Sequence, residues 1–288
     1  MAGQIEQIKF ESAKLIMMDI QIIEILLGAL TGIVLALSGA GGAILAVPLL
    51  IFGLHFDITE ATPIALLAVC LAASIGAIGA HIQGKVRYRA AGSIAIAGAL
   101  AVPTGIWLSK KIPTAPLTLL FAMVLAYVAY DMFRQSKRND ENTEASASRT
   151  FSGPCMLDSP GGRLVWTWTC IRVLALSGFL AGTLSGLLGV GGGFVIVPAL
   201  KKVTNFKIQS ILATSLTVIT LTSGVGVISA TLMGTMNWPI ALPFAGGAIA
   251  GMLFGRFIAK RFSGSRLQQN FAVTAALVSV GLIIKVIL

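Results

Sequence analysis

Long stretches without charge alternate with short polar segments along the chain. Asp, Glu, Lys and Arg are absent from residues 25–56, 61–84, 90–109, 112–130, 173–200, 208–255 and 267–284. A helix needs about 20 apolar residues to cross the hydrocarbon core of a bilayer. Most of these stretches reach that length, and the longest, 208–255, has room for two crossings. The pattern predicts an all-α polytopic integral membrane protein, placed as a multi-pass protein in the inner (cytoplasmic) membrane.

One apolar segment is written twice. Residues 28–50 read GALTGIVLALSGAGGAILAVPLL and residues 178–200 read GFLAGTLSGLLGVGGGFVIVPAL, so glycines and prolines pair at an offset of 150. Further along, Ala61-Thr62 aligns better with Ala213-Thr214, a slip of two residues. We therefore expect two transmembrane repeats, which span 20–133 and 172–288. They follow an N-terminal lead-in, 1–19, and are joined by a polar cytoplasmic linker, 134–171.

Each half is expected to contain a broken helical segment followed by three transmembrane helices. A straight helix over 20–52 would be about 50 Å long, well beyond a hydrocarbon core of about 30 Å. The cluster of glycines in this segment, and the matching cluster in 173–200, therefore predict a break in each half. The three helices that follow are expected at 61–83, 90–109 and 115–133, and at 209–233, 239–258 and 267–288.

The charged residues between these segments indicate how the halves are oriented. The chain carries a net charge of +10, and most of its basic residues lie in predicted loops. Segment 53–60 contains two acidic residues and no basic one, whereas its counterpart 201–207 contains three lysines. Basic loops stay in the cytoplasm, so matching loops lie on opposite sides and the repeats have inverted topology. This places 84–89, 134–171, 201–207 and 260–266 inside and both termini outside, although Lys110-Lys111 then violates the rule.

The glycine clusters also predict a binding site for an anion. A helix broken within the membrane frees backbone N–H groups, and the N-terminus of a restarted helix attracts negative charge. Hydroxyl groups nearby could complete the site, although such groups inside a membrane often bond to their own helix. Packing between helices is the alternative for glycines, and we favour it for Gly28, Gly32, Gly178 and Gly182. The candidate substrate-binding residues are Ser38, Gly39, Gly41, Gly42, Thr62, Gly189, Gly191, Gly192, Gly193, Thr214 and Ser215.

Other classes of function find little support in the sequence. The basic residues form no compact domain with interleaved aromatics, so nucleic acid is not an expected partner. Neither glycine cluster has the spacing of a nucleotide-binding loop. The three cysteines, Cys70, Cys155 and Cys170, lack metal-ligand spacing, and their odd number argues against a disulfide framework. We expect no catalytic residues, no metal and no cofactor, and His81 is the one candidate for a proton carrier.

The doubled motif resembles that of the sulfite exporter TauE/SafE family. The match is stronger in the second half, which reads GVGGGFVIVP over 189–198, than in the first, where Ala43 stands at the place of Gly193. The resemblance implies a secondary transporter that exports small sulfur-containing anions such as sulfite or organosulfonates. An anion channel, a carrier for a different small organic anion and a scaffold subunit remain alternatives. The expected partners are a small anionic substrate and the lipid bilayer, and a homodimer is left open.

Overall fold

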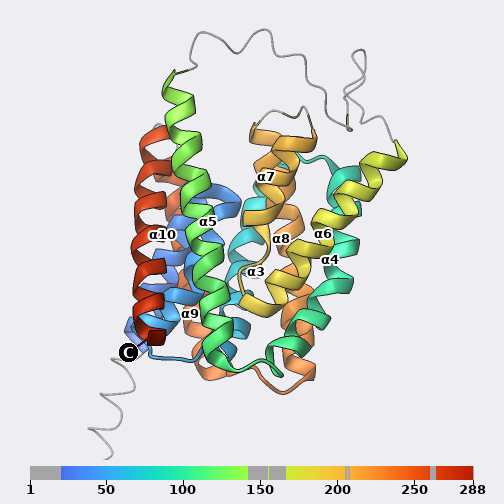
Figure 1. Cartoon of the computed structure of the whole chain (residues 1–288). Coiled ribbons are helices and arrows are strands. Elements are labelled where there is room, and N and C mark those ends of the chain that lie inside the picture. Colours follow the sequence, from blue (N-terminus) through green and yellow to red (C-terminus); the bar gives the residue numbers. More distant parts are fainter. Residues whose placement is uncertain are drawn as a thin grey trace, which may run out of the picture.

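The computed structural model describes residues 21–141, 155, 167–204, 206, 208–259 and 264–287. The predicted lead-in 1–19 and most of the predicted linker lie outside this part of the chain. The described residues are almost entirely helical (Figure 1). Seven of the described helices are long and apolar enough to cross a membrane. The prediction of an all-α, multi-pass membrane protein is therefore confirmed.

Both halves contain the expected elements in the expected order. The first half consists of a first helix Gln21–Ser38, a 3₁₀ helix η1 (Gly39–Leu45), α2 (Ala46–Gly53), α3 (Ile58–Ile82), α4 (Tyr88–Ser109) and α5 (Thr114–Glu141). The second half consists of α6 (Trp168–Leu188), α7 (Gly193–Val203), α8 (Ile208–Leu232), α9 (Trp238–Ala259) and α10 (Gly264–Ile287). In each half a broken segment precedes three long helices.

Left-handed glycines cause the breaks. Gly189 ends α6 with φ of 72°, and Gly191 and Gly192 also have positive φ, at 70° and 71°. Only glycine adopts this conformation without strain, so the chain reverses and α7 returns beside α6 (Figure 1). In the first half, Gly39 has φ of 68° and ends the first helix. The prediction that residues 39–42 would be non-helical is wrong, because these residues begin the 3₁₀ helix η1.

Glycines allow two pairs of helices to cross at very short distance. The helix α4 packs extensively against α6, and the first helix meets α9 in the same way. A Cβ added to any of four glycines would overlap a backbone carbonyl oxygen of the facing helix. These pairs are Gly28 with Phe244, Gly32 with Ala248, Gly178 with Ile94, and Gly182 with Gly98. The packing role predicted for these four glycines is confirmed.

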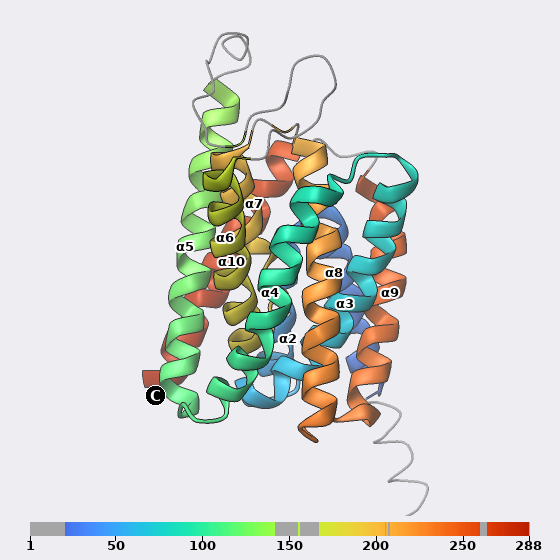
Figure 2. The ribbon, with the colours of Figure 1, turned by 90° about the vertical axis from the view of Figure 1, so that its right-hand side faces the viewer.

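The contacts of one half recur in the other with the roles exchanged. Gly178 lies 150 positions after Gly28, and Phe244 lies 150 positions after Ile94. The contact of Gly28 with Phe244 therefore corresponds to that of Gly178 with Ile94. The helices α3 and α8 pack on each other, as do α5 and α10. Figures 1 and 2 show α5 running toward the end of the molecule at which α10 begins, so the two helices run in opposite directions. An inverted repeat requires this arrangement, and the inverted relation itself stays a prediction.

The offset of 150 continues through the central helices. The bounds of α3 and α8 differ by 150 at both ends. Gly189 lies against Thr62, and Gly39 lies against Leu212, which is the counterpart of Thr62 at that offset. The two-residue slip inferred from Ala61-Thr62 and Ala213-Thr214 is therefore wrong. Thr214 stands where the first half has Ile64.

One disulfide holds the linker against the second broken segment. Cys155 and Cys170 are bonded to each other, and both are buried. The backbone of Cys155 also pairs with the end of α7, where its N–H donates to the Val203 carbonyl over 3.3 Å. The odd number of cysteines pointed away from disulfides, and that inference is wrong for this pair. Cys70 is free, and its thiol faces the Thr220 carbonyl at 3.5 Å.

Candidate anion site

Residues 189–192 connect α6 to α7 and form the tip of a helical hairpin. This hairpin tip lies between α3 and α8, near the middle of their length. A Cβ on Gly191 would stand 3.0 Å from side-chain atoms of Val69, Ile219 and Ser223. Val69 and Ile219 are the twelfth residues of their 25-residue helices. The tip is therefore far from both ends of the bundle, in the depth range at which transporters place substrate sites.

The start of α7 offers hydrogen-bond donors to this region. Gly192 is the N-cap residue, and no side chain within the described part of the chain caps the helix. The first turn of any helix has N–H groups without helical partners, and these groups carry the positive end of the helix dipole. In an 11-residue helix that begins at Gly193, such donors lie next to the hairpin tip. An anion placed there would find donors without any basic side chain.

Hydroxyl groups without partners lie nearby. The side-chain oxygens of Ser185, Ser215 and Ser223 are buried and have no hydrogen-bond partner within the described structure. Ser223 faces the hairpin tip, because its Oγ is 3.0 Å from the point where a Cβ on Gly191 would lie. A buried polar group without a partner costs about 1–3 kcal/mol of folding free energy. This cost suggests that a ligand supplies the missing partner.

The unpartnered serines contrast with the threonines of the same helix. Thr214, Thr217, Thr220, Thr222 and Thr231 each donate to the carbonyl one turn earlier in α8, over 2.6–3.0 Å. Such bonds are the usual fate of hydroxyls in apolar helices. Ser215 and Ser223 are eight residues apart and share the face of α8 that carries Ile219. The unpartnered hydroxyls of Ser215 and Ser223 thus lie on the face of α8 that meets the hairpin tip.

The other predicted hydroxyls are already bonded. Ser38 donates to the Val34 carbonyl over 2.6 Å, and Thr62 donates to Ile58 over 2.7 Å. Thr214 donates to the Ser210 carbonyl and accepts the N–H of Arg87 at 3.2 Å, which ties the α3–α4 loop to α8. Among these four predicted hydroxyls, that of Ser215 has no hydrogen-bond partner within the described residues.

The predicted glycines of the first half are arranged differently from those of the second. Gly39, Gly41 and Gly42 all lie in η1, whose 3₁₀ bonds occupy backbone donors. A Cβ on Gly42 would meet Leu35 and Ser38, so this glycine allows η1 to fold onto the first helix. η1 contacts both α7 and α8, which brings the two glycine segments together at the centre of the bundle.

Sequence reasoning missed Ser185 and Ser223. The available signal was the hydroxyl content of 208–232, which is much richer in serine and threonine than the matching segment 58–82. Which of these hydroxyls is free depends on the face of α8 that the hairpin tip meets. That information is not in the residue types.

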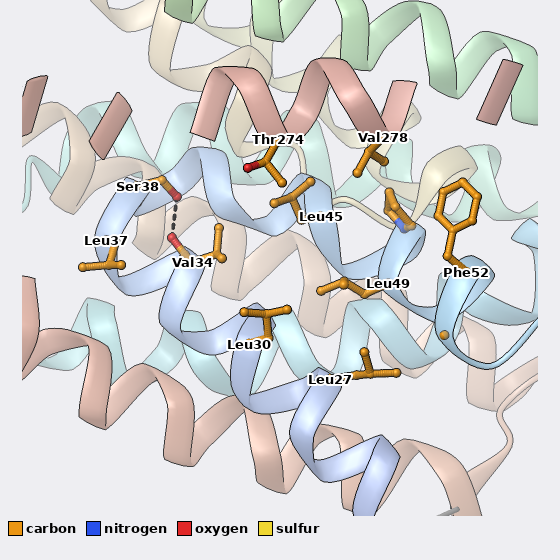
Figure 3. Close-up of a pocket in the computed structure, with 12 residues that line it drawn as sticks. Leu27, Leu30, Val34, Leu37, Ser38, Leu45, Leu49, Phe52, Thr274 and Val278 are labelled. Carbon is orange, nitrogen blue, oxygen red and sulfur yellow. Dashed lines mark hydrogen bonds between the residues drawn. The ribbon is translucent and has the colours of Figure 1, made fainter. Parts of the chain in front are cut away.

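A separate cavity of about 560 Å³ lies between the first helix, α2 and α10. Figure 3 shows leucines of the first helix and α2 pointing into it, with Thr274 and Val278 on the α10 side. Ser38 is at its edge, but its hydroxyl is bonded to Val34 (Figure 3). The lining is nearly all apolar, so this cavity suits hydrocarbon and offers little to an anion.

The ionisable residues of the transmembrane region lie away from the hairpin tip. His81 is exposed at the end of α3 and shares a hydrogen bond with the Tyr88 hydroxyl. Arg256, in the last turn of α9, donates to the Ile75 carbonyl over 2.9 Å and fills the space beside Gly79. Glu24, near the start of the first helix, is buried, with only 2% of its surface exposed.

Comparisons with known proteins place the chain among transporters. The Sulfite exporter TauE/SafE family matches residues 24–282. A "Probable membrane transporter protein" of Xylella fastidiosa (strain Temecula1 / ATCC 700964) is 29% identical over 248 residues, which are 84% of this chain and 86% of that protein. The "Probable membrane transporter protein YunE" of Bacillus subtilis (strain 168) is 27% identical over 270 residues, 91% of this chain and 97% of that protein. No solved structure matches significantly.

The family match and the arrangement of helices agree. The matched region begins in the first helix, ends in α10 and includes both broken segments with their glycine clusters. The chain therefore belongs to the sulfite exporter TauE/SafE family of membrane transporters.

Proposed function

We propose that this protein is a secondary transporter that carries a small sulfur-containing anion, such as sulfite or an organosulfonate, out across the cytoplasmic membrane. The observation that carries the proposal is the position of the unpartnered Ser223 hydroxyl beside Gly191, two residues before the uncapped start of α7. Both groups donate hydrogen bonds, and both lie near mid-depth. The family match supports sulfur oxyanions as the substrate class.

The membrane potential favours this direction. A dianion that leaves a cell with a negative interior gains about 4.6 kcal/mol at 100 mV, at about 2.3 kcal/mol for each charge. Export of a dianion therefore needs no coupled cation.

Burial of the site favours a carrier over an open channel. Ser185, Ser215 and Ser223 are all fully buried. An anion can reach these groups only after the hairpin tip and α8 move apart. Conformational opening of this kind is the basis of alternating access.

Flux measurements on the purified chain in liposomes test the proposal. Sulfite, sulfate, thiosulfate, taurine, sulfoacetate and acetate would be compared, with protein-free liposomes as the blank. We expect saturable flux of at least one sulfur oxyanion and accelerated exchange when the same anion is loaded on the opposite side. Flux that does not saturate would favour a channel. Acetate as the preferred substrate would favour a carrier for another organic anion, and flux equal to the blank would overturn the proposal.

A further inference from the structure

We infer that the anion site is one-sided: the second half supplies the groups that bind the anion, and the first half supplies an apolar wall. This inference rests on the proposed function and departs from the symmetric site that the doubled glycine motif suggests. It assigns Ser223 as a direct ligand of the anion. Ser215 is a second hydroxyl along the path of the anion on α8.

Equivalent positions of α3 and α8 carry different side chains. At the offset of 150 that relates α3 to α8, Ser215 corresponds to Ala65 and Ser223 to Ala73. Both alanines are fully buried. Where the second half offers hydroxyls, the first half offers methyl groups, which form no hydrogen bond to an anion.

The backbones of the two glycine clusters also differ. Gly191 and Gly192 are left-handed and lie outside any helix, so the following α7 begins freshly at Gly193. The corresponding glycines of the first half lie inside η1. The 3₁₀ bonds occupy donors there. In α7 the N–H groups of Gly193 and Phe194 precede the first helical bonds, which run from Val195 and Ile196 to the Gly192 carbonyl.

The position of Ser215 along α8 also matters. The Oγ of Ser223 lies 3.0 Å from the point where a Cβ on Gly191 would stand, two residues before α7 begins at Gly193. Ser215 lies eight residues earlier in α8, about 12 Å along the helix axis. Leu212, one turn before Ser215, contacts Gly39 of the first half. Along α8, Ser215 thus lies between Leu212, which contacts Gly39, and Ser223, which faces Gly191, and an anion travelling along α8 would meet it.

Replacement of Ser223 by alanine separates a ligand from a structural group. If the hydroxyl is unpartnered without substrate, its removal leaves the thermal stability of the purified protein unchanged or raises it. If it binds the anion, the KM for uptake of radiolabelled sulfite into proteoliposomes rises about tenfold to a hundredfold, because a hydrogen bond to a charged group is lost. Loss of an anion ligand would therefore raise the KM without lowering the thermal stability, whereas loss of a structural group would lower the thermal stability.

Matched controls come from the same helix pair. Thr217→Val removes a hydroxyl of α8 that is bonded to the Ala213 carbonyl, and we expect the KM to stay within about twofold of the wild type. Ala73→Ser places a hydroxyl at the equivalent position of α3. In the Ser223→Ala background it should not restore the KM, because no anion-binding group faces it in the first half.

The outcomes separate this inference from the proposed function. Saturable wild-type uptake together with a normal KM for Ser223→Ala would overturn the one-sided site and leave the transporter proposal intact. Rescue of Ser223→Ala by Ala73→Ser would show a symmetric site and overturn the inference. Equal losses of stability and uptake in Ser223→Ala would assign the hydroxyl a structural role. Absent wild-type uptake would instead count against sulfite transport itself.

Discussion

At the scale of single residues, Gly182 allows α4 and α6 to approach each other closely. A side chain at this position would overlap the backbone of Gly98, which cannot move without displacing α4. Overpacking of a well-packed interface usually costs about 1–3 kcal/mol, and a clash with backbone is at the upper end or beyond. We expect Gly182→Leu to lower strongly the yield of folded protein, measured by size-exclusion chromatography in detergent.

Gly92 provides the matched control for this prediction. It lies in α4, and a Cβ added to it would have no neighbouring atom within 4 Å. Gly92→Leu should therefore give a yield close to that of the wild type. Equal yields for the two variants would contradict the packing role of Gly182.

Gly192 illustrates a different constraint. From sequence, Gly192→Leu looks like a clean probe that abolishes transport and spares folding. Its φ of 71° and the Ala181 carbonyl oxygen, 2.7 Å from an added Cβ, show that a leucine there would also strain the hairpin. Ser223→Ala is the cleaner probe because it removes one oxygen and adds no atoms.

At the scale of elements, apolar length and glycine clusters predicted the helices well. The segment expected at 61–83 is α3, Ile58–Ile82, and the segment expected at 239–258 is α9, Trp238–Ala259. The end of α5 differs most, because this helix continues from the expected 133 to Glu141. A run such as Arg134-Gln135-Ser136-Lys137 favours helix in water as well, so charge marks the membrane boundary without ending the helix.

The candidate site was harder to predict than the helices. Glycine density located the hairpin tip at 189–192, since reversal of the chain there needs positive φ. Whether a hydroxyl is free depends on which face of α8 the tip meets, and Thr214 and Ser215 differ in this respect although they are adjacent. The 3₁₀ helix at Gly39–Leu45 could not be distinguished from an open loop by composition alone.

The disulfide links the linker to the entrance of the α6–α7 hairpin. It closes a loop with a sequence separation of 15 residues, which corresponds to about 3 kcal/mol of stabilisation in the chain-entropy account. We expect reduction, or Cys170→Ala, to lower the midpoint of thermal unfolding of the purified protein. Cys70→Ala is the control and should change the midpoint much less, because this thiol is free.

Thiol counting checks the bond directly. In denaturant without reductant we expect one reactive thiol, that of Cys70, and after reduction all three cysteines should react. Three reactive thiols before reduction would show that Cys155 and Cys170 are not bonded in the purified protein.

At the scale of the whole molecule, the two ends of the bundle differ in charge. The end that carries the last turn of α7 has Lys201 and Lys202, whereas the α2–α3 loop at the opposite end precedes Glu60 and contains Asp57 (Figure 2). The two lysines that violate the positive-inside rule have local roles. Lys110 donates to the Met233 carbonyl at 3.5 Å, and Lys111 lies 3.8 Å from the centre of the Trp107 ring. These contacts give both lysines local partners at the end of the bundle that carries Asp57, and the orientation of the bundle stays a prediction.

This asymmetry predicts the result of a labelling experiment. Asp57→Cys and Lys202→Cys would each be introduced into a Cys70→Ala chain, in which the bonded pair does not react with maleimide. A membrane-impermeant maleimide applied to intact cells should label Asp57→Cys and should label Lys202→Cys only after permeabilisation. These residues belong to the matching segments 53–60 and 201–207 of the two halves, so labelling from opposite sides is what inverted repeats require. Labelling of both residues from the same side would contradict the inversion, and reversed labelling would keep the inversion but place the basic end outside.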